Sequence, residues 1–201
     1  MRTNKSITRR LTIAGMIGTA GVYAFPVVAL SKSDAEKLIE RLTNDVLSAV
    51  NEQKSDKIMF VKFETIFSKY ADVPLIARKA LGPTWREASK AQRSAYVSAF
   101  KSYMARYYGK RFEGFLGSKI VVSNSRKTSG GFLVGSNIIL KDGSSYQAQW
   151  HVIDARGKFL MYNLFLEGVS VLSDVRVQIG SMLDKRGGSI EKLTSHLNTA
   201  S

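Results

Sequence analysis

The chain has 201 residues, of which 44% are hydrophobic and 23% charged, a balance that is typical of a folded globular domain and excludes a disordered chain. It contains no cysteine, which excludes disulfide scaffolds, thiolate metal sites and cysteine nucleophiles. The formal net charge is +14. The first 29 residues hold four basic residues and no acidic ones, so the remainder still carries a net charge of +10. Such an excess favours polyanions or anionic membrane surfaces as partners.

The N-terminus has the three-part layout of a secretory signal. Residues 1–10 are polar and basic, an apolar run extends from Leu11 to Phe25, and small residues lead to Ala29. We therefore predict a cleavable export signal over 1–29 and a single domain over 30–201. The Arg9–Arg10 pair resembles a twin-arginine signal, from which Thr12 departs. The alternative is an uncleaved membrane anchor, since the apolar stretch is nominally long enough to span a bilayer.

Helical periodicity dominates the first half of the remaining chain. Apolar residues recur every three or four positions over 33–54, where Ser33 is the expected N-cap, and again over 56–70. A short helix is expected from Pro74 to Leu81. The longest helical stretch covers about 89–116 and carries an aromatic stripe.

After Gly117 the periodicity becomes that of strands. Short β-branched or alternating runs cover 119–122, 132–140, 146–152 and 159–166, separated by turn residues such as Asp142–Gly143. Residues 171–185 and 189–198 are expected to be helical again. The order predicts an α+β fold, in which N-terminal helices pack on a curved, roughly four-stranded antiparallel or mixed sheet. C-terminal helices complete the domain.

The sequence offers little for catalysis. It contains no GxSxG, HExxH, Walker A or GxGxxG motif. His151 and His196 have no neighbours at ligand spacing, and we interpret both as ordinary surface or rim residues. Asp154 fits a hairpin turn, and Glu167 fits a structural hydrogen bond at a strand end better than a catalytic acid. We therefore expect neither an enzyme nor a metal site.

Aromatic residues are the strongest functional signal. They lie on the apolar faces of the predicted helices and strands, so they form either a packed core or the wall of an apolar cavity between helices and sheet. Because they do not alternate with the basic residues, and because an export signal precedes them, we do not expect nucleic-acid binding.

The chain also resembles a known family, the MlaC family of toluene-tolerance proteins. The resemblance covers nearly all of the chain after the export signal. It rests on the residues Ala88–Tyr96 with Phe100, Tyr103 and Tyr107–Gly109, on Ala80–Gly82 with Trp85, on Glu167–Ser170, on Arg176 and on Gly188–Leu193. Asn163 departs from the family pattern, which usually has Asp in that strand.

The resemblance implies a periplasmic lipid carrier of the Mla pathway, which maintains outer-membrane lipid asymmetry. Such a protein holds phospholipid acyl chains in an apolar cavity. It moves the lipid between an outer-membrane lipoprotein complex and an inner-membrane ABC transporter with an MCE-domain protein, touching membrane surfaces transiently. Phospholipid is then the cargo, and no cofactor is expected. The alternatives are a periplasmic adaptor without bound lipid and a carrier of another apolar lipid, such as a hopanoid.

Two sets of residues follow from this hypothesis. The predicted cavity wall consists of Phe63, Phe67, Phe100, Tyr103, Met104, Tyr107, Ala148, Trp150 and Val152. The predicted head-group rim consists of Lys101, Arg106 and Lys110, for which the alternative is a solvated helix face.

Overall fold

The computed structural model describes residues 31–52, 54–155 and 157–200. The predicted export signal lies outside these residues. The described helices are α1 (Lys32–Asn51), α2 (Asp56–Tyr70), α3 (Val73–Leu81), α4 (Thr84–Glu87), α5 (Lys90–Arg111), the 3-10 helix η1 (Phe112–Phe115), α6 (Val171–Asp184) and α7 (Ile190–Thr199). The strands are β1 (Lys119–Thr128), β2 (Gly131–Ile139), β3 (Ser145–Asp154), β4 (Phe159–Leu166) and β5 (Val169–Ser170).

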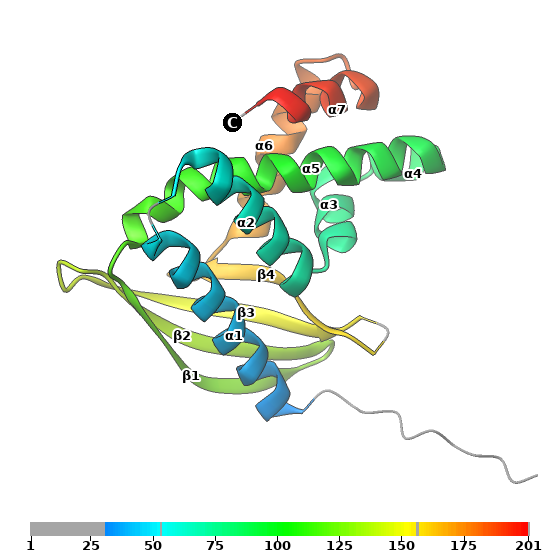
Figure 1. Ribbon diagram of the computed structural model, residues 1–201. Coiled ribbons are helices and arrows are strands. Elements are labelled where there is room, and N and C mark those ends of the chain that lie inside the picture. The colour runs from blue at the N-terminus through cyan, green and yellow to red at the C-terminus, as the bar shows by residue number, and fades with distance from the viewer. Residues whose placement is uncertain (1–30, 53, 156, 201) are drawn as a thin grey trace, which may run out of the picture.

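The five strands form one antiparallel sheet in the order of the sequence. Figure 1 shows α1 crossing one face of this twisted sheet, with α2 and then α5 stacked above it and α7 beyond α5. The fold is therefore the predicted α+β arrangement. The short strand β5 and the single turn α4 were not predicted, because two and four residues are too few to produce a periodic pattern.

Alternation along β3 places its even-numbered side chains toward the helices. Ala148, Trp150 and Val152 are buried, as the pattern predicts, whereas Tyr146 is 44% exposed near the hairpin turn. Register shifts interrupt the pairing of β1 with β2 after Val122 and of β3 with β4 after His151. Such bulges bend strands and give a sheet the curvature that leaves room beneath a helix layer.

The apolar side chains form two cores. One lies between α1, α2 and the inner face of the sheet, and the other joins α3, α5, α6 and α7. Helix α5 belongs to both, since Ala105 packs in the first core and Tyr96 in the second. This double burial positions one side of α5 above the sheet.

Local capping explains where the helices begin, with one correction. Helix α1 is capped by Ser31, whose hydroxyl accepts a hydrogen bond from the Asp34 amide, and not by Ser33 as predicted. Ser33 already lies in the first turn of the helix. Helix α5 begins with a complete capping box between Ser89 and Gln92.

Candidate functional site

An apolar cavity of about 330 Å³ lies between the helices and the sheet. That volume is within the range of small-molecule pockets, roughly 300–1,000 Å³. Its walls come from α1, α2, α3, α5, η1, strands β1 to β4 and the start of α6. Its lining is almost wholly apolar, so the space is suited to hydrocarbon rather than to a polar metabolite.

Helix α2 supplies one wall. Phe63, Ile66, Phe67 and Tyr70 recur at spacings of three and four, which places them on one helix face. Phe63 stacks on Phe112 of η1 with ring centroids 5.0 Å apart. The Tyr70 hydroxyl donates to an Asp45 carboxylate oxygen at 2.8 Å, so its polar tip is satisfied by α1.

The sheet supplies the facing wall, where Trp150 is the largest side chain. Its Nε1 donates a hydrogen bond to Ser136 Oγ at 2.9 Å within the sheet. Because the indole nitrogen is satisfied there, no unpaired donor of Trp150 is left at the cavity.

A polar cluster stands where β4 meets α6. Asn163 Oδ1 accepts hydrogen bonds from the amides of Leu164 at 2.9 Å and Leu172 at 3.1 Å. Its Nδ2 donates to Ser170 Oγ at 3.0 Å, and Ser170 in turn caps α6. An aspartate carboxylate at position 163 could not make that donation, whereas the asparagine amide can.

One charged side chain among the described residues lines the cavity, namely Arg111 at the end of α5. Its guanidinium lies 3.5 Å from the ring centroid of Tyr107, and its Nη1 donates to the Tyr107 carbonyl at 2.9 Å. Tyr108 lines the cavity beside it. Burial, with a further contribution from Tyr107, raises the pKa of Tyr108 to about 12, so its hydroxyl remains a donor at neutral pH.

The structure brings four of the nine predicted wall residues to this cavity: Phe63, Phe67, Met104 and Trp150. Their contact with lipid stays a prediction. Ala148 and Val152 are fully buried in the first core without lining the cavity.

The aromatic stripe of α5 points elsewhere. Phe100 and Tyr103 fill the second core, and the hydroxyl of Tyr107 accepts a hydrogen bond from Gln178 of α6. The α5 residues that line the cavity are Met104, Ala105, Tyr108 and Arg111. The sequence pattern identified the aromatic face of α5 that packs in the second core. It missed the face that lines the cavity, because α5 is buried on two sides.

None of the three predicted rim residues lines the cavity. Lys101 lies 3.0 Å from a Glu64 carboxylate oxygen. Arg106 donates to the carbonyls of Leu197 and Ala200, where it satisfies the C-terminal end of α7. Lys110 is exposed and does not line the cavity. These side chains point toward α2, α7 and solvent respectively.

His151 is partly buried, and neighbouring side chains engage both nitrogens of its ring. Its Nε2 lies 3.1 Å from Thr128 Oγ1 and its Nδ1 lies 2.8 Å from the Tyr162 hydroxyl. The cause is the bulge after His151, where Tyr162 packs against the imidazole. Glu167 accepts a hydrogen bond from the Gln147 amide, as the structural interpretation of this residue predicts.

Two features are absent from the described residues. No group of three or more His, Cys, Asp or Glu in this part of the chain could hold a metal ion. None of the helices that the structure describes is long and apolar enough to cross a bilayer.

The fold and the cavity define an α+β protein with an apolar cavity between helices and sheet. The chain matches the MlaC protein family over residues 40–199 and belongs to that family. Its fold is similar to that of a phospholipid-binding protein from Ralstonia solanacearum, solved in complex with a phospholipid. The TM-score is 0.67 and the identity 18%, and the match covers 82% of this chain and 94% of the other.

Proposed function

We propose that this protein is a non-enzymatic lipid carrier, which holds the acyl chains of a phospholipid in the cavity between α2, α5 and the sheet. The observation that carries the proposal is the cavity itself: about 330 Å³ of space with apolar walls and one cation among its described lining residues. Membership of the MlaC family and a fold shared with a phospholipid-bound protein support it.

The energetics of such a cargo require a carrier that works by contact. Moving the acyl chains of a phospholipid with about 30 methylenes into water costs roughly 24 kcal/mol of free energy, at about 0.8 kcal/mol for each methylene. Release into solution is therefore negligible. Exchange with a bilayer is close to neutral, because the bilayer interior is as apolar as the cavity. Lipid must then enter and leave where the protein touches a membrane or a partner.

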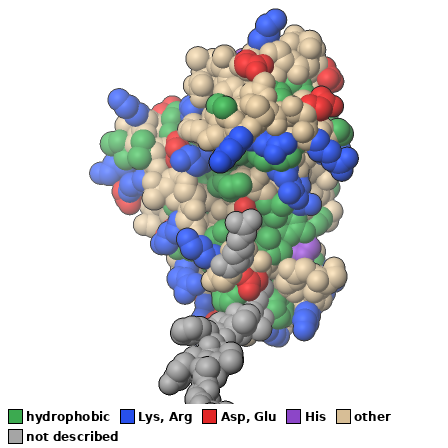
Figure 2. All heavy atoms as spheres, turned by 90° about the vertical axis from the view of Figure 1, so that its right-hand side faces the viewer, with side chains coloured by type: hydrophobic (Ala, Val, Ile, Leu, Met, Phe, Trp, Pro, Cys, Tyr) green, Lys and Arg blue, Asp and Glu red, His purple; other side chains and the backbone are tan. Residues whose placement is uncertain are grey.

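We further propose that the protein works in the periplasm after export. There it would carry phospholipid between an outer-membrane lipoprotein complex and an inner-membrane ABC transporter with an MCE-domain protein. Its surface charge suits transient contact with anionic lipids and acidic partners, at about 1 kcal/mol for each well-placed Lys or Arg. Figure 2 shows Lys and Arg side chains outnumbering acidic ones on the face in view.

Native mass spectrometry of the protein, purified from the periplasm without detergent, tests the proposal. We expect a stoichiometric mass increment that matches phospholipid. The variant Ala105→Trp places a large ring on the cavity wall and should lose the increment. The control Ala95→Trp puts the same ring on an exposed position of α5 and should keep it. Circular dichroism establishes that both variants fold.

Three other results would contradict the proposal. A wild-type protein without lipid, which also takes none from labelled vesicles, would be an adaptor. A hopanoid mass would identify a carrier of another lipid. Equal lipid content in the two tryptophan variants would place the lipid outside this cavity.

A further inference from the structure

Arg111 brings a positive charge to the mouth of the cavity. Arg111 lines the cavity and is nevertheless exposed, so it stands where the apolar space meets water. The ion pairs among the described side chains join Lys32 to Glu36, Lys62 to Glu52, Lys69 to Asp45 and Lys101 to Glu64, and none of them includes Arg111. Its charge is therefore available to a ligand at the mouth.

The position of the guanidinium is fixed before any ligand arrives. The ring of Tyr107 lies beneath it, and one of its five N–H donors is engaged by the Tyr107 carbonyl. Tyr107 is itself held by Gln178 of α6. Such pre-orientation lowers the entropy lost on binding and leaves the remaining donors for an anion.

Tyr108, three residues before Arg111 on α5, is a second hydrogen-bond donor. Tyr108 lines the cavity and is half-buried, and its hydroxyl is protonated at neutral pH. Arg111 and Tyr108 are one helical turn apart on α5 and both line the cavity. A guanidinium and a phenolic O–H both suit the non-bridging oxygens of a phosphodiester, which guanidinium groups bind with two parallel hydrogen bonds. Asp174 also lies near Tyr108. Its carboxylate repels any anion, the phosphodiester included, so the guanidinium must supply the attraction.

We propose that Arg111 and Tyr108 hold the phosphodiester of the cargo at the mouth and thereby select lipids that carry a phosphate at the boundary between acyl chains and water. The inference rests on the proposed function and names the residues that recognise the phosphate of its cargo. Lipids with the same chains but no phosphate, such as diacylglycerol, would fill the cavity without engaging either side chain. The alcohol esterified to the phosphate would project into solvent, so different phospholipids would bind alike.

A competition experiment tests this selection. The protein is incubated with phosphatidylglycerol vesicles that contain a small fraction of diacylglycerol with identical acyl chains, and native mass spectrometry gives the ratio of the two bound lipids. We expect wild-type protein to prefer the phospholipid. Arg111→Gln should reduce that preference about tenfold, since a hydrogen bond to a charged group contributes about 1.5–3 kcal/mol. Arg111→Lys should fall between them, and Tyr108→Phe should lose a smaller factor.

Lys110→Gln is the matched control, because it removes the same charge from the adjacent exposed position that does not line the cavity. Its lipid ratio should equal that of wild type. An Arg111→Gln ratio equal to that of Lys110→Gln would overturn the inference while leaving the carrier function intact. If wild-type protein took up neither lipid, the proposed function itself would fail. Tyr108→Phe and Arg111→Lys provide a reading should Arg111→Gln not fold.

Discussion

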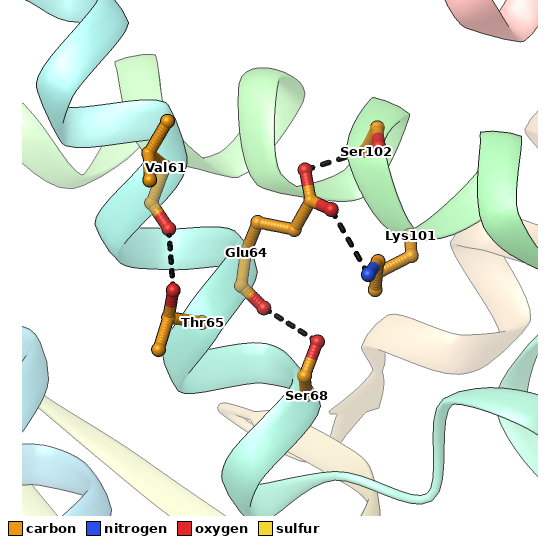
Figure 3. A network of polar contacts seen from close by, with 6 residues as sticks. All are labelled: Val61, Glu64, Thr65, Ser68, Lys101 and Ser102. Atoms are coloured by element: carbon orange, nitrogen blue, oxygen red, sulfur yellow. Dashed lines mark hydrogen bonds and ion pairs between the residues drawn. The ribbon is translucent and has the colours of Figure 1, made fainter.

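The carboxylate of Glu64 on α2 lies 3.0 Å from Lys101 Nζ on α5 and also accepts a hydrogen bond from the Ser102 hydroxyl (Figure 3). Glu64 is on the helix whose other face forms a wall of the cavity. Two further ion pairs join α2 to the end of α1, through Lys62 with Glu52 and Lys69 with Asp45. Polar contacts on the outside of the molecule thus hold the helix that covers the proposed lipid.

Substituting Glu64→Gln should weaken the attachment of α2 to α5 while lowering the free energy of unfolding only slightly. Both partners of the ion pair are about one-third exposed, and such pairs contribute at most about 1 kcal/mol to stability. If α2 must move for lipid to leave, losing about 1 kcal/mol of stabilisation allows lipid to be released up to about fivefold faster. Transfer of a fluorescent phospholipid from the protein to acceptor vesicles measures that rate.

The control for this variant is Glu40→Gln, which removes an exposed carboxylate from α1 that takes part in none of the described ion pairs. Its transfer rate should match that of wild type. Equal rates for the two variants would show that the link between α2 and α5 does not limit release.

The start of β2 depends on a glycine. Gly131 has φ of 151°, and a Cβ built there would lie 2.0 Å from the Val152 carbonyl oxygen on β3. Gly131→Ala should therefore destabilise the protein by at least about 2 kcal/mol, because either the backbone or the strand pairing must shift. Gly130→Ala, with no atom within 4 Å of its Cβ, should cost less than about 1 kcal/mol. Urea unfolding compares them, and similar midpoints would refute the account of this turn.

The sequence predicted the element order and the fold because amphipathic periods and turn residues are local signals. It could not show which residues of α5 line the cavity. Phe100 and Met104 both lie on apolar faces, yet only Met104 lines the cavity. Which apolar face meets a space and which meets another helix depends on tertiary packing. Nor could charge alone show that Arg106 is used to cap α7 while Arg111 remains at the mouth.

Acid should destabilise the protein partly through His151. Burial, followed by the nearby charges of Arg126 and Lys79, lowers the pKa of His151 below its ordinary value of 6.5. The unfolded chain therefore binds more protons than the folded one between that value and the lower folded pKa, and stability falls as pH decreases through this window. Burial also lowers the pKa of His196.

The variant His151→Gln should flatten this dependence without abolishing it, since His196 remains. Urea midpoints measured from pH 7.5 down to pH 5 provide the comparison. A variant whose midpoint falls as steeply as that of wild type would mean that His151 does not titrate in this range.

The most direct test of the central claim is fluorescence quenching by a phospholipid with brominated acyl chains. The chain has two tryptophans: Trp150 lines the cavity, and Trp85 lies on α4 beside Arg93. In Trp85→Phe, where Trp150 is the remaining emitter, uptake of the brominated lipid should quench most of the emission. In Trp150→Phe, uptake of the same lipid should leave the emission of Trp85 nearly unchanged. Quenching of Trp85 with little effect on Trp150 would contradict the claim that acyl chains occupy this cavity.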